Sequence, residues 1–122
     1  MGIFYTDCEV VNIKQQTKKA TVSKLLVDSG SENTWIPAEV LKRIGVPVSK
    51  KDEPFLMANG ETITRSIGYA LLRAQDFETV DEVVFAQPGD LALLGARTLE
   101  GFGAVVDARR KKLVAAGPRP VA

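Results

Sequence analysis

The segment from Leu25 to Gly30 is the part of the sequence that most constrains how this chain can fold. Leu25 to Val27 is a short, uninterrupted apolar run, which is typical of a strand covered on both faces. Asp28 follows directly, and a carboxylate at the end of a buried strand is costly unless it is hydrogen-bonded or takes part in chemistry. Gly30 permits a tight turn and the close approach of another backbone. The segment therefore predicts a buried strand that delivers one acid to a tight turn.

Two interpretations of this acid are open at the level of the tripeptide. Asp-Ser-Gly is a common turn sequence, so Asp28 could simply cap backbone N–H groups in a small structural β-domain. The alternative is that the carboxylate does chemistry, and the rest of the chain has to decide between them.

Composition narrows the classes of protein. A length of 122 residues fits one domain, and 45% hydrophobic residues are enough to fill one core. The net charge of +1 gives no electrostatic reason to expect nucleic acid or a membrane surface as a partner. No apolar run approaches the roughly 18 residues of a spanning helix, and the first ten residues lack a signal-peptide pattern. We therefore expect a cytoplasmic protein.

Two residue types are scarce or missing in ways that limit the chemistry. The chain has no histidine and one cysteine, Cys8. Without histidine there can be no Ser-His or Cys-His nucleophile pair and none of the common zinc sites. If the chain is an enzyme, carboxylate or lysine chemistry must carry the reaction, and we expect no metal and no cofactor.

A second informative segment is Asn59-Gly60, which lies between the apolar stretch 55–58 and the strand-like stretch 61–66. Asn-Gly between strands is the strongest short hairpin signal and predicts a type I′ turn with a positive φ at Gly60. The hairpin is either an ordinary surface turn or a flap that closes over a substrate cleft. Residues 46–53 are predicted to be a connection, and Gly68 is predicted to interrupt the following strand.

The whole chain predicts about eight short strands and two short helices, the first beginning at Pro37 and the second at Ala96. Short strands at this spacing predict an all-β fold, mainly β with two short helices, arranged as a closed or nearly closed β-barrel. Residues 1–115 are expected to form one domain. Residues 116–122, with two prolines, are expected to be a flexible tail.

The order of these segments resembles a known family. Asp28-Ser29-Gly30-Ser31, between Leu-Leu-Val and Trp-Ile-Pro, is similar to the Asp-Thr/Ser-Gly-Ala/Ser signature of aspartic proteases. A hairpin at Asn59-Gly60, an apolar-apolar-glycine segment at 93–95 and a short helix at 97–100 follow in the order of the retropepsin-like, single-domain (clan AA) branch. The resemblance spans roughly residues 3–114 and implies the acid-protease fold.

The resemblance also implies an activity, an aspartic endopeptidase that works as a homodimer on peptides or unfolded proteins. Each chain would supply one catalytic Asp28, and a water between the two acids would attack the peptide bond. The implied supporting and substrate-binding residues are Ser29, Gly30 and Ser31 in the active-site loop, and Met57, Ala58, Asn59, Gly60 and Leu93 in the flap and pocket.

The chain departs from retroviral relatives after the apolar-apolar-glycine segment. Those proteins commonly carry an arginine there that pairs near the active site, whereas this chain has Ala96, with Arg97 one position later. One residue on a helix is about 100° of rotation, which argues against the same ion pair. An intact Asp28 does not separate cutting from binding, so a non-catalytic dimeric module that binds peptides or a partner in the same groove is the alternative.

Overall fold

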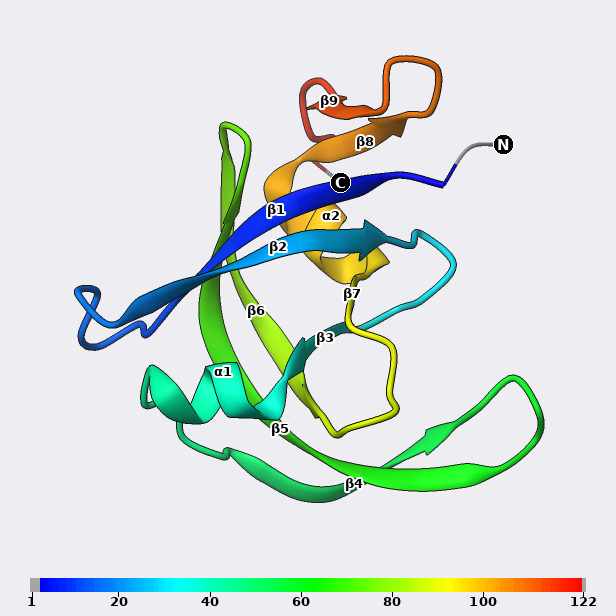
Figure 1. The fold of residues 1–122 in the computed structure, drawn as a ribbon. Helices are drawn as coiled ribbons and strands as arrows, with labels where there is room; N and C mark the ends of the chain where they lie inside the picture. The colour runs from blue at the N-terminus through cyan, green and yellow to red at the C-terminus, as the bar shows by residue number, and fades with distance from the viewer. Residues whose placement is uncertain (1–2, 122) are drawn as a thin grey trace.

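The computed structural model describes residues 3–121, which form nine strands and two helices (Figure 1). The elements, in chain order, are β1 (Tyr5–Val11), β2 (Lys19–Val27), β3 (Thr34–Pro37), α1 (Ala38–Arg43), β4 (Lys50–Leu56), β5 (Thr62–Ala74), β6 (Phe77–Ala86), β7 (Leu93–Leu94), α2 (Ala96–Phe102), β8 (Ala104–Asp107) and β9 (Lys112–Ala115). The prediction of a mainly β chain with two short helices is confirmed.

Six strands form a ring in the order β1-β2-β7-β3-β6-β5, and pairing of β1 with β5 closes it. Most neighbours in the ring are antiparallel, but β2 pairs with β7 and β3 pairs with β6 in parallel. β4 lies outside the ring as the partner of β5, and β8 and β9 form a separate two-stranded sheet. Closure leaves few open edges, which is how small β proteins avoid edge-to-edge association.

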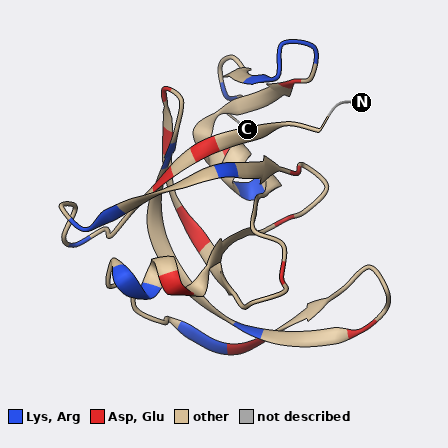
Figure 2. Ribbon diagram, in the orientation of Figure 1, with Lys and Arg blue, Asp and Glu red and all other residues tan. Residues whose placement is uncertain are grey.

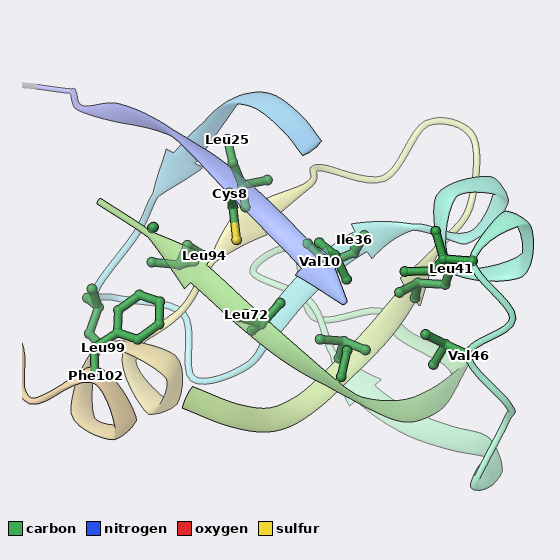
Figure 3. Packing of buried hydrophobic residues seen from close by; sticks show 14 of the residues in the cluster. Cys8, Val10, Leu25, Ile36, Leu41, Val46, Leu72, Leu94, Leu99 and Phe102 are labelled. Atoms are coloured by element: carbon green, nitrogen blue, oxygen red, sulfur yellow. The ribbon is translucent and has the colours of Figure 1, made fainter. Parts of the chain in front are cut away.

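The interior of the ring is filled by apolar side chains from all parts of the chain (Figure 3). Cys8 and Val10 alternate inward along β1, and they meet Leu25 of β2, Leu72 of β5 and Leu94 of β7. Each fully buried aliphatic side chain of this kind contributes about 1.5–3 kcal/mol. Helix α1 adds Leu41 and α2 adds Leu99 and Phe102 to the same cluster, so both short helices are held by packing rather than by their own length.

A second, smaller cluster lies on the other face of the central strands. Its buried members are Trp35, Ile67, Val84, Ala86 and Leu93, with Leu26, Phe55 and Ile63 packed against them. The ring of Trp35 meets that of Phe55 on β4 edge to face, with centroids 5.1 Å apart. The two leucines of β7 divide between the clusters, since Leu94 belongs to the main core and Leu93 to the second one.

The long strand β5 differs from the prediction, because it runs through Gly68 without interruption. A Cβ on Gly68 would lie 2.7 Å from the carbonyl oxygen of Pro47, so glycine is needed there for close packing rather than to end a strand. The segment Lys50–Glu53, predicted to be part of a connection, belongs to β4. Its lysines and acids hid a strand that lies at the edge of the sheet.

The hairpin between β4 and β5 is present, but its turn is not of type I′. The N–H of Gly60 donates to the carbonyl of Met57 at 2.9 Å, and the N–H of Met57 donates to Glu61 at 2.7 Å. Gly60 has the predicted positive φ, +88°, whereas Asn59 is not among the positive-φ residues. This is a three-residue loop with glycine in the left-handed position, the next most common solution for a hairpin.

Neither α1 nor α2, the helices of the described residues, has the length and apolar character needed to cross a membrane.

Candidate active site

Asp28 lies immediately after β2, in a loop of residues 28–33 that we call the acid loop. Its backbone N–H donates to the carbonyl of Leu94 at 2.9 Å, and its carbonyl accepts from Ser31 at 3.1 Å. Its Oδ1 accepts the N–H of Gly30 at 3.0 Å. Asp28 is half-buried, and the hydrogen bond to Oδ1 orients its carboxylate. Within residues 3–121, no hydrogen bond is made to the second carboxylate oxygen, Oδ2.

The acid loop is held at both of its ends by β7. Leu26 and Val27 of β2 pair in parallel with Leu93 and Leu94, and Trp35 of β3 pairs with Leu93 from the other side. β7 therefore passes between the strands that enter and leave the loop (Figure 1). Because Leu93 and Leu94 are both buried, the support beneath Asp28 is part of the packed interior.

The first turn of α2 binds the outer part of the loop. The N–H of Ala96 donates to the carbonyl of Ser31 at 2.7 Å, and that of Arg97 donates to Glu32 at 3.1 Å. These are N–H groups that a helix leaves unpaired at its start, so the loop satisfies them. A Cβ on Gly95 would overlap the carbonyl of Asn33, so only glycine allows the helix to come this close.

The side chain of Arg97 does not take part in this contact. Its Nη1 donates to Glu82 Oε1 of β6 at 3.0 Å, and Lys50 binds the other oxygen of the same carboxylate at 2.7 Å. Hydrogen bonding to Lys50, reinforced by the charge of Arg97, holds the pKa of Glu82 below its usual range. As expected from its position one residue later, the Arg97 side chain makes its ion pair with β6, and α2 contacts the acid loop through its backbone.

A chain of hydroxyl groups, which the sequence analysis missed, braces the same region. Gly95 N–H donates to Thr34 Oγ1 at 2.9 Å, the hydroxyls of Thr34 and Thr98 lie 2.6 Å apart, and Thr98 donates to Asp81 Oδ2 at 2.8 Å. Because the single proton of Thr98 goes to the carboxylate, Thr34 must donate to Thr98 and accept from Gly95. Both threonines are fully buried, and only Thr34, which precedes Trp35 and Ile36, lies in an apolar stretch that could have indicated it.

The other residues of the acid loop that the sequence predicted have different surroundings. Ser29 and Gly30 are exposed. Ser31 is half-buried, and its hydroxyl donates to the carbonyl of Asn33 at 3.2 Å within the same loop. Among residues 3–121 the side chain of Ser29 makes no hydrogen bond. The loop is thus rigid on the side that faces its own chain and open on the side that carries Ser29.

The predicted pocket and flap residues come from two further places. Leu93 is buried in the second cluster, one residue from the partner of Asp28. Met57, Ala58, Asn59 and Gly60 are all exposed at the tip of the hairpin. In the view of Figure 1, the hairpin tip and the acid loop project to the same side of the molecule. Surface hollows of about 780 Å³ beside α2 and about 360 Å³ beside α1 are lined by neither Asp28 nor this tip.

Other routes to chemistry are weak. Burial raises the pKa of the Cys8 thiol to about 12, which removes it as a nucleophile. The described residues contain no group of three or more acids or cysteines arranged to hold a metal ion.

We predict that Thr98→Val lowers the free energy of unfolding by about 1–3 kcal/mol, because it leaves the buried hydroxyl of Thr34 and the Asp81 carboxylate without their partner. Urea unfolding measures this. The control is Thr98→Ser, which keeps the hydroxyl and loses only a methyl group. If valine is tolerated as well as serine, the hydroxyl chain does not stabilise the loop.

Comparison with known proteins agrees with the architecture of the site. A family model described as aspartyl protease matches residues 11–98, a range that runs from the end of β1 into α2 and includes the acid loop, the hairpin and β7. No curated protein matches the chain. The matched range covers well over half of the chain and agrees with the predicted resemblance, and this chain therefore belongs to the retropepsin-like branch of the aspartyl protease family.

Proposed function

We propose that two copies of this chain form one active site and hydrolyse peptide bonds with a water held between their two Asp28 carboxylates. The observation that carries the proposal is an acid on a loop that β7 and α2 hold rigid from inside, while its outer side, at Ser29 and Gly30, stays exposed. Such a loop can bind a second surface through its exposed side without rearranging.

The need for a second copy follows from the number of acids. The sequence contains one Asp-Ser-Gly triplet, and a carboxylate dyad needs two. A two-fold axis beside the acid loop would bring the second Asp28 opposite the first and would place identical surfaces in contact. The exposure of Ser29 and Gly30 supports an axis on that side of the loop.

The reaction follows from the electrostatics of the pair. Two carboxylates a few ångström apart cannot both ionise easily, so the dyad holds one proton, and its pKa values belong to the pair. The ionised acid takes a proton from the water as the water oxygen attacks the peptide carbon. The protonated acid polarises the carbonyl oxygen. When the C–N bond breaks, a proton passes from the dyad to the leaving nitrogen.

Neighbouring residues would orient the reactants. The N–H of Gly30 fixes one oxygen of Asp28, which limits how the carboxylate can turn. The absence of a side chain at Gly30 would let the peptide backbone approach. The second cluster, in which Leu93 is 7% exposed, would present apolar surface to substrate side chains on either side of the cut once the hairpin opens. An extended peptide would pair with the strands around it by β-addition.

The hairpin tip would act as a flap over that peptide. Leu56 and Met57 are adjacent apolar residues at the tip, with 78% and 38% of their surfaces exposed. Adjacent exposed apolar side chains at a hairpin end support contact with a ligand or a second chain. A flap must open and close, so it has to be one of the less stable parts of a structure. A two-stranded hairpin meets this requirement because it is only marginally stable by itself.

We predict that Asp28→Asn lowers the rate of peptide cleavage by at least about 100-fold while the fold is kept, since an amide is nearly isosteric but cannot share the dyad proton. A mixed peptide library, incubated between about pH 4 and pH 7, gives the readout.

The matched control is Asp76→Asn, which changes an exposed acid in the turn between β5 and β6. Equal cleavage by wild type and Asp28→Asn would exclude Asp28 as the catalyst. A wild type that binds peptides without cutting them would establish the non-catalytic binding module instead.

We predict that Ser29→Ala weakens the dimer more than Ser31→Ala does, because the Ser31 hydroxyl is already bound within its own loop. One hydrogen bond across the axis contributes about 0.5–1.5 kcal/mol and occurs twice by symmetry, so the dimer dissociation constant should rise roughly 5- to 150-fold. Sedimentation over a concentration series measures it. Equal effects of the two variants would remove the cross-axis role of Ser29.

A further inference from the structure

The hairpin that would cover the substrate extends beyond the ring of strands. Pairing of β5 with β6 starts at Ile67 with Val84 and runs to Ala74 with Phe77. The preceding part of β5 pairs with β4 alone, from Glu53 with Arg65 to Leu56 with Thr62. Residues 53–66, here called the outer hairpin, are therefore a two-stranded ribbon, and such a ribbon is marginally stable by itself. Something other than strand pairing must hold it in place.

Two contacts fix the outer hairpin to the rest of the chain. One is apolar, since Phe55 and Ile63 pack on the second cluster and Phe55 meets Trp35. The other is an ion pair, in which Arg65 Nε donates to Asp90 Oδ2 at 2.7 Å and Nη2 donates to Oδ1 at 2.8 Å. Two parallel bonds between guanidinium and carboxylate fix distance and angle together. Figure 2 shows acidic and basic residues together on this hairpin.

Asp90 is itself held firmly by the loop in which it lies, residues 87–92. Its N–H donates to the carbonyl of Gln87 at 2.9 Å, and its Oδ2 accepts the N–H of Gln87 at 2.8 Å. The side chains of Arg65 and Asp90 are only 20% and 11% exposed. Hydrogen bonding to Arg65 lowers the pKa of Asp90, which favours the charged form of the carboxylate in this pair.

The loop that holds Asp90 leads directly into the support of the acid loop. β7 begins three residues after Asp90, and Leu94 accepts the N–H of Asp28. The contacts thus run from the outer hairpin through Arg65 and Asp90 to loop 87–92, then through β7 to Asp28. The ion pair therefore joins the outer hairpin to the loop that leads into β7.

We propose that Arg65 and Asp90 are positioning residues that set where the hairpin stands relative to the groove, so that hairpin and loop 87–92 hold the substrate as one unit. This role rests on the proposed function, in which the hairpin covers a bound peptide. With the pair broken, the outer hairpin keeps only its apolar contact and moves away more often. Substrate capture then suffers more than the chemical step at Asp28.

Hydrogen exchange of the free protein tests the mechanical part without any need for activity. Arg65→Gln and Asp90→Asn should each speed exchange at residues 55–64 by about fivefold or more. Asn at position 90 keeps an oxygen for the N–H of Gln87, so the loop turn survives. The control is Arg73→Gln on the same strand, whose guanidinium pairs with Glu78 and Glu9 at the far end of β5. This control should leave exchange at 55–64 unchanged.

Peptide cleavage kinetics test the positioning part. The two variants should raise KM about fivefold or more and change kcat less than about twofold. The double variant Arg65→Gln with Asp90→Asn should raise KM little more than either single variant does, because both substitutions remove the same contact. Arg65→Lys should recover little, since lysine cannot make the two parallel bonds.

Each result has one meaning. The proposal is overturned if exchange at 55–64 matches the Arg73→Gln control, if KM does not move when exchange does, or if the loss in the double variant is the sum of the losses in the single variants. If the wild type cuts peptides but exchange at 55–64 is unchanged in the Arg65 and Asp90 variants, the positioning role is wrong and the proposed protease activity stands. If exchange at 55–64 rises in the variants but the wild type cuts no peptide, the ion pair anchors the hairpin and the proposed protease activity is wrong.

Discussion

The structure depends on the close approach of two backbones, where the start of α2 comes against the acid loop at Gly95. A side chain at this position would overlap the carbonyl of Asn33 and would lie 2.9 Å from that of Glu32. Without one, the N–H groups of Ala96 and Arg97 bind the carbonyls of Ser31 and Glu32. The N–H groups that have no partner within the helix thus donate their hydrogen bonds to the loop that carries Asp28.

The remaining elements make that contact rigid. The β7 leucines face both hydrophobic clusters, so any movement of the acid loop would have to displace packed side chains on two sides of the sheet. The buried hydroxyls of Thr34 and Thr98 link Gly95 to Asp81 on β6, which ties the start of α2 to the ring. The loop that carries Asp28 is therefore ordered within the single chain, and in the proposed dimer the association of two chains would have little left to order.

The sequence was most informative where a local pattern fixes the backbone. The run Leu25–Val27 before Asp28 predicted a strand that leads into the acid, and with it the family, although only Leu25 of the three is fully buried. Asn59-Gly60 predicted the hairpin. It failed where the determining contact comes from far along the chain. Gly68 is needed because of Pro47, and the partners Thr34 and Thr98, or Arg65 and Asp90, are 64 and 25 residues apart. Local propensity cannot predict contacts between residues so far apart in the sequence. The charged residues at the start of β4 show no alternation of apolar and polar residues, so no pattern there indicated a strand.

The central claim is that each chain holds half of one catalytic site, and the stoichiometry of a transition-state analogue tests it most directly. A peptide with a hydroxyl-bearing carbon in place of the scissile carbonyl would be titrated into the protein by calorimetry. The prediction is a stoichiometry of one inhibitor per two chains, together with much weaker binding of the inhibitor to the Asp28→Asn variant. Saturation at one inhibitor per chain, with the protein still monomeric by sedimentation, would contradict it.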